Sequence, residues 1–164
     1  MNTSEIASIE SKLSIITIAL SNLDNKHDRA RSQGSGYTRS NIEPVIDSYI
    51  KLESQKDVLT IRLKVLAALG TDTSDPEQVR AIETNAVRAE LTSILAEATV
   101  LEEQRDAAFE LMREFCPEED SPEAQVISYN AAKAEFYDAL ILSGRLQNRM
   151  SNIYKHFKIG KPSD

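Results

Sequence analysis

The chain has 164 residues, and its 26 acidic and 19 basic side chains give a formal net charge of −7. Gly and Pro number five each, too few for a β-sandwich or barrel, which turns about every 8–12 residues. A single Cys excludes a disulfide within the chain, and two His residues leave little material for a zinc site. Apolar runs are short and no secretory leader is visible, so we expect no membrane contact and a cytoplasmic protein, or part of a particle assembled inside the cell.

The first half of the chain predicts two helices. From Ile6 to Leu23, apolar residues recur at alternating spacings of three and four, which is a seam along one face of a helix. A second seam with nearly the same spacing extends from Ile42 to Leu66, and Gly70 is its expected stop. Because the linker between the two seams is short, we predict an antiparallel hairpin over about residues 3–69.

The second half predicts another pair of helices. Asp75 followed by Pro76 is a typical helix start, and a seam then extends from Val87 to Phe115. The fourth helix begins at Ser121 and Pro122 and ends near residue 158. Its apolar seam includes Leu140, and we expect a kink or a close helix crossing at Gly144. This second hairpin spans about residues 75–158 and leaves a short tail, residues 159–164.

These features predict an all-α protein with a single domain, residues 1–164, built from elongated antiparallel helical hairpins or a four-helix, coiled-coil-like bundle. Helices of about 30–40 residues are about 45–60 Å long, so a rod or stacked hairpins fit them better than a compact globule. The first helix is apolar over more than a narrow seam, because Ile15 and Ile18 add to it. Such breadth predicts burial against two or more neighbours.

Residues suited to catalysis are sparse. His27 and His156 stand apart, and neither follows a Glu at the spacing that di-iron bundles use. The run from Gly34 to Ser40 superficially resembles a phosphate-binding loop, but it joins two helices and follows no strand. We therefore predict no enzyme, no catalytic residue, no cofactor and no metal.

Negative charge is concentrated in residues 76–123, which hold 13 acidic and 4 basic side chains. Carboxylates toward a helix C-terminus oppose the helix dipole. Glu103, Glu110 and Glu114 lie there, so we predict that they bind a partner, with a solvated face as the alternative.

Positive charge collects at the other end of the fourth helix, at Arg149, Lys155 and Lys158. A hairpin with opposite charges at its two ends can stack head to tail with further copies, so these residues are also predicted to bind a partner. A third candidate surface is the tip of the first hairpin, at Arg31, Tyr37 and Arg39, where a solvated loop or a protein contact is expected. Nucleic acid is not an expected partner of such an acidic chain.

The sequence thus predicts a non-enzymatic structural or assembly protein. It would act through helical packing and self-association, as a homo-oligomer or as a subunit of a larger protein complex or particle. The alternative is an acidic helical inhibitor or adaptor that occupies a basic groove on a partner protein.

Overall fold

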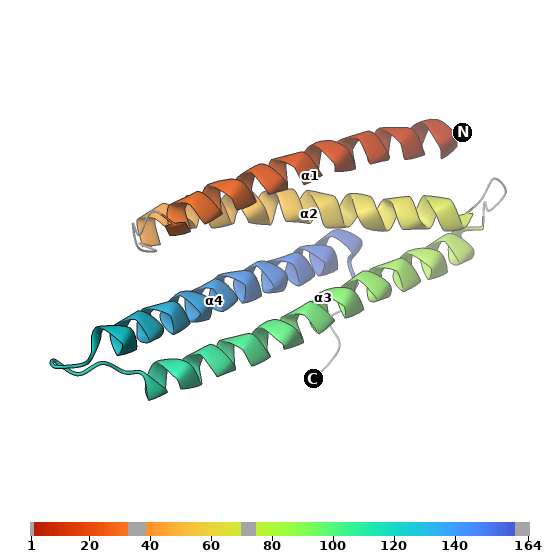
Figure 1. Cartoon of the computed structure of the whole chain (residues 1–164). Helices are drawn as coiled ribbons and strands as arrows, with labels where there is room; N and C mark the ends of the chain where they lie inside the picture. The colour runs from red at the N-terminus through yellow and green to blue at the C-terminus, as the bar shows by residue number, and fades with distance from the viewer. Residues whose placement is uncertain (1, 33–38, 70–74, 160–164) are drawn as a thin grey trace. The chain divides into compact units, whose positions relative to one another are not determined.

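A computed structural model describes residues 2–32, 39–69 and 75–159, with the side chains of residues 2, 30–32 and 39–43 outside the description. Of the described residues, 92% are helical and none is in a strand (Figure 1). The all-α prediction is therefore confirmed.

The structure has four described helices. They are α1 (Asn2–Ser32), α2 (Arg39–Leu69), α3 (Pro76–Glu114) and α4 (Glu123–Phe157). The predicted stop at Gly70 lies outside the described residues.

Local sequence explains where α3 begins and where α4 ends. The backbone N–H of Glu77 donates to Asp75 Oδ1 at 3.0 Å, and that of Val79 donates to the Asp75 carbonyl at 3.1 Å. Asp75 is thus the predicted cap, and Pro76 takes the first position, where its missing N–H costs little. After α4, Lys158 has a φ of 51°, the left-handed conformation that commonly ends a helix.

The chain divides into two compact units. Unit 1 is Met1–Thr92 with Asn148–Asp164, and unit 2 is Ser93–Gln147. The division falls within α3 and α4, so it does not follow the linker that separates the two predicted hairpins.

In unit 1, α1 packs antiparallel against α2 (Figure 1). The hydroxyl of Tyr49 donates to Asp24 Oδ1 at 2.6 Å, and Arg62 Nε donates to Glu5 Oε1 at 2.9 Å. The end of α1 thus meets the start of α2, and the start of α1 meets the end of α2.

The core of unit 1 is aliphatic with one tyrosine. Its buried apolar residues are Ile9, Ile16, Tyr49, Ile61, Val65, Val87 and Ile153. Ile15 and Ile18 of α1 are 65% and 60% exposed, so the described part of the chain does not bury the broad apolar face of α1 at these two residues, and its burial against another copy stays a prediction. One helix neighbour buries one stripe of α1, whereas the sequence pattern suggested two.

The segment Thr3–Arg29 of α1 is long and apolar enough to cross a membrane, by length and composition alone. Core helices of soluble proteins and signal sequences pass the same test, so this is weak evidence. The segment contains no long uninterrupted apolar run, because small polar residues such as Ser14 and Thr17 separate its apolar residues. Run length alone therefore did not predict it.

In unit 2, the C-terminal part of α3 lies antiparallel to the N-terminal part of α4 (Figure 1). The rings of Phe109 and Phe136 have centroids 5.9 Å apart, and Gln125 Nε2 donates to the Cys116 carbonyl at 3.3 Å. A Cβ added to Gly144 would meet nothing within 4 Å, so the structure shows no close helix crossing at this residue, and the alternative, a kink, stays a prediction. The buried apolar side chains of unit 2 are Ile94, Ala108, Ala132, Ala139 and Leu146.

Candidate functional site

A buried ion pair joins α2 to α4 within unit 1. Arg149 Nε donates to Asp57 Oδ2 at 2.9 Å, and Arg149 Nη2 donates to Asp57 Oδ1 at 2.9 Å. Asp57 is 2% exposed, and the Arg149 side chain is 16% exposed. The guanidinium and the carboxylate therefore form a bidentate pair largely removed from water, the strongest geometry for this interaction.

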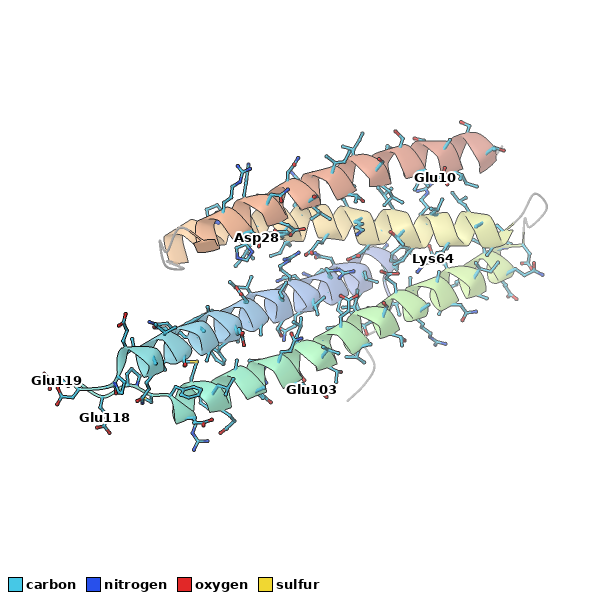
Figure 2. The ribbon with its side chains drawn as sticks, viewed as in Figure 1. Glu10, Asp28, Lys64, Glu103, Glu118 and Glu119 are labelled. Atoms are coloured by element: carbon cyan, nitrogen blue, oxygen red, sulfur yellow. The ribbon has the colours of Figure 1, made fainter. Side chains whose placement is uncertain are left out.

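Two further charges extend this pair to α3. Arg149 Nη2 lies 3.8 Å from Glu90 Oε1, and Lys64 Nζ donates to Glu90 Oε2 at 2.8 Å. Glu53, one turn before Asp57, is also buried. We call these five residues, Glu53, Asp57, Lys64, Glu90 and Arg149, the buried charge network, and Lys64 on α2, labelled in Figure 2, is its exposed end, with 49% of its side chain exposed.

Burial raises the pKa of Asp57 above its ordinary value of 3.8. The hydrogen bond and positive charge of Arg149 act in the opposite direction, and the negative charges of Glu90 and Glu53 add to the rise. Loss of water thus outweighs the pairing with Arg149. Burial of the charged Asp57 carboxylate therefore has a free-energy cost, which its two hydrogen bonds with Arg149 on α4 offset in part.

The buried charge network can position helices, because its charges come from α2, α3 and α4. It holds two basic and three acidic side chains, and no buried side-chain nitrogen or oxygen among the described residues lacks a hydrogen-bond partner. The described residues also contain no group of three or more His, Cys, Asp or Glu side chains that could hold a metal ion. The expected absence of catalysis and of a metal stays a prediction.

Apolar periodicity did not predict this network. The seam predicted for α2 ran through Leu59 and Leu63, which are half-buried, whereas the buried row contains Glu53, Asp57 and Ile61. A signal was present, because residues 49, 53, 57, 61 and 65 recur every four positions, and three of these are apolar or aromatic. Carboxylates in such a row are candidates for burial with a cationic partner.

Unit 2 carries most of the exposed large hydrophobic side chains. Eight of the ten found among the described residues lie in its 55 residues. A pair of helices buries one stripe on each partner, so apolar residues beside those stripes remain in contact with water. Such exposed apolar area on a folded protein commonly marks a contact site.

Four of these eight residues lie on one side of unit 2, which we call the aromatic surface. Phe109 contacts Phe136, whose ring lies 5.7 Å from that of Tyr137, so these side chains share a side. Leu95 lies about four turns before Phe109 on α3, and Leu140 lies about one turn after Tyr137 on α4, so helical spacing places both on the same side. The exposed members of the aromatic surface are Leu95, Phe109, Tyr137 and Leu140.

The other four lie on the opposite side, which we call the aliphatic surface. Val100 precedes Phe109 by nine residues, and Ile127 precedes Phe136 by nine. Nine residues are about two and a half turns, so each lies on the far side of its helix from the aromatic contact. The members of the aliphatic surface are Val100, Leu111, Ile127 and Leu142.

The two surfaces differ in charge. Unit 2 has 12 acidic and 4 basic residues, while unit 1 has 14 acidic and 15 basic, so unit 2 carries all of the net negative charge. On the aromatic surface, Arg105 pairs with Asp106 at 2.8 Å, and Arg113 pairs with Glu110 at 3.1 Å. Helical spacing puts Lys133 on that side too, so its charges are nearly balanced.

The predicted acidic partner-binding residues all lie on α3 in unit 2. Glu103, Glu110 and Glu114 are exposed. Figure 2 shows Glu103 on the side of α3 away from α4. Glu110 accepts hydrogen bonds from Arg113 at 3.1 Å with both oxygens. The structure thus gathers the three on the outer part of one helix, and their binding role stays a prediction.

The predicted basic residues are divided. Lys155 and Lys158 are exposed in unit 1, whereas Arg149 belongs to the buried charge network. Of the predicted tip residues, Tyr37 lies outside the described residues, as do the side chains of Arg31 and Arg39.

Comparisons with known proteins give no family for the chain. No protein-family model matches it, and no curated protein or solved structure shows significant similarity.

Proposed function

We propose that the protein is a non-enzymatic assembly protein whose helices pack against other protein chains, with self-association through the aromatic surface of unit 2. One observation carries this proposal: eight of the ten exposed large hydrophobic side chains of the described residues lie in unit 2. In the proposed oligomer, the antiparallel helices of two copies pack together as a coiled-coil-like bundle.

The aromatic surface suits a second copy because its charges are nearly balanced. In a symmetric dimer the same surface of both copies meets, so both sides of the interface carry the same net charge. A surface with a strong net charge would therefore repel its counterpart. Here Arg105 and Arg113 are paired with acidic residues on the same helix. Phe109 and Tyr137 add exposed aromatic area, which is typical of interface cores.

Sedimentation velocity over a range of protein concentrations tests this proposal. We expect a defined oligomer, and the double variant Leu95→Gln/Leu140→Gln should weaken association at least about tenfold, or about 1.4 kcal/mol. The matched control is Val100→Gln/Ile127→Gln, which changes the same number of exposed apolar residues on the opposite side. A chain that stays monomeric at about 100 μM, or equal effects of both variants, would contradict self-association through this surface.

An acidic inhibitor or adaptor is the second candidate function. The concentration of net negative charge in unit 2 favours it. In this case the protein would be a monodisperse monomer that binds a basic partner, and its binding would weaken as salt is added.

A further inference from the structure

The aliphatic surface of unit 2 has the geometry of a site for a helix. Val100 and Leu111 are eleven residues apart on α3, and Ile127 and Leu142 are fifteen apart on α4. Both spacings are close to whole numbers of turns, so each pair forms a row along its helix. Ala107 and Ala131, both exposed, lie along these rows, and small side chains at such positions allow another helix to approach closely.

Acidic residues border these rows. Glu103 follows Val100 by three positions and Glu114 follows Leu111 by three, while Glu123 precedes Ile127 by four and Glu135 precedes Leu142 by seven. These spacings are about one or two turns, so the four carboxylates lie beside the apolar rows. All four are exposed, and the basic residue on this side is Arg145. The surface therefore has an apolar centre and a mainly acidic border.

This combination selects among possible occupants. A second copy would bring two acidic borders together, which like-charge repulsion opposes. A helix with an apolar stripe flanked by Lys and Arg matches both the rows and the border.

We propose that the aliphatic surface binds a basic amphipathic helix of a partner protein, with Val100, Leu111, Ile127 and Leu142 as its apolar contacts. The proposal deepens the proposed function, since it rests on unit 2 making the contacts of the protein. It concerns the opposite surface, so the two can fail separately.

Fluorescence anisotropy with labelled synthetic peptides and the full chain tests the proposal. The probe is an amphipathic helix of Leu and Lys in heptads, and the controls are the same peptide with Glu for Lys and a scrambled Leu/Lys peptide. We expect the Leu/Lys helix to bind and both controls to bind at least tenfold more weakly. The variant Val100→Gln/Ile127→Gln should lose at least tenfold in affinity, and Leu95→Gln/Leu140→Gln should bind as the wild type does.

A charge variant separates binding from folding. Glu103→Gln/Glu135→Gln leaves the apolar rows intact, so its circular dichroism should match the wild type while its affinity for the Leu/Lys helix falls several-fold. Equal affinities for both apolar variants, or tight binding of the scrambled peptide, would overturn the proposal. Dissociation of an oligomer by Val100→Gln/Ile127→Gln would overturn it too, because a second copy would then occupy the surface.

Self-association and peptide binding are read out independently. A chain that self-associates and does not bind the Leu/Lys helix overturns this inference alone. A monomer that binds the helix through the aliphatic surface overturns only the proposed self-association.

Discussion

Asp57 shows how a single residue can define the arrangement of its neighbours. Its carboxylate is almost without solvent, and Arg149 supplies two hydrogen bonds from another helix. Replacing one member of a buried pair leaves an uncompensated charge, whereas replacing both by apolar residues of similar size is often neutral or stabilising. We therefore expect the pair to specify which helices meet more than it stabilises them.

A double-mutant cycle tests this view of the pair. Arg149→Met should lower the free energy of unfolding by about 3–5 kcal/mol, because Asp57 then remains buried without its partner. Asp57→Leu/Arg149→Met should recover most of that loss. Urea unfolding followed by circular dichroism gives these values and that of the single variant Asp57→Leu, which completes the cycle. If the two single losses add up to that of the double variant, the two side chains do not act as a pair.

The raised pKa of Asp57 predicts a pH dependence of stability. Above the ordinary pKa of 3.8, the Asp57 carboxyl keeps its proton in the folded chain and loses it in the unfolded chain. The stability that this proton contributes is therefore fully present below pH 3.8 and is lost as the pH rises through the pKa of the folded state. Asp57→Asn removes the titration. Its free energy of unfolding, relative to the wild type, should therefore rise with pH across this window.

Unfolding in urea at a series of pH values above 3.8 measures that difference. Glu53, Glu90 and Arg149 act on the Asp57 carboxylate, Lys64 pairs with Glu90, and all four are unchanged in both proteins. Asp28→Asn, at an exposed position of α1, is the control for a simple loss of charge. A constant difference between Asp57→Asn and the wild type would mean that the fold does not favour the protonated carboxyl.

At the scale of helices, the apolar pattern predicted buried residues of α3 correctly, but on α4 a different row of residues is buried. The predicted α3 seam includes Val87, Ile94 and Ala108, all of which are buried. On α4 the predicted seam included Leu140, which is 40% exposed. The row buried there repeats every seven residues and consists of Ala132, Ala139, Leu146 and Ile153.

Neighbouring residues on α3 offer a sharp test of the packing. Ile94 is fully buried and Leu95 is 58% exposed. Ile94→Ala should lower the free energy of unfolding by about 2–5 kcal/mol, because it leaves a cavity. Leu95→Ala should change that of the monomeric chain by less than about 0.5 kcal/mol, because its side chain is already exposed there. Thermal or urea unfolding measures both changes. Equal losses would contradict the structure, in which α3 buries the face of Ile94 and exposes that of Leu95.

For the whole chain, the uneven distribution of charge leads to a prediction about binding. Glu103, Glu110 and Glu114 lie in unit 2, which carries all of the net negative charge. Replacing all three by Gln should leave the helical spectrum unchanged and weaken binding of a basic amphipathic peptide. Wild-type binding should also weaken with salt, because the Debye length falls from about 10 Å at 0.1 M to about 3 Å at 1 M.

The control for this triple variant makes the same charge change in unit 1. Glu10→Gln/Asp28→Asn/Asp47→Asn removes three exposed carboxylates there and should leave peptide binding nearly unchanged. Salt-independent binding, together with a triple Gln variant that binds as tightly as the wild type, would remove the acidic residues from the contact.

Composition and periodicity by themselves determined that the protein is all-α, and they located the start of α3 through the Asp75–Pro76 cap. These features are local, because a cap and a helical repeat depend on residues a few positions apart. The tertiary structure alone decided which apolar residues stay exposed, as at Ile15 and Ile18, and which charges are buried, as at Asp57. Burial depends on which helices meet, and Asp57 is paired with Arg149, 92 residues away in sequence. A pattern within one helix shows how many faces could be buried, but only the packed neighbours determine which of them are.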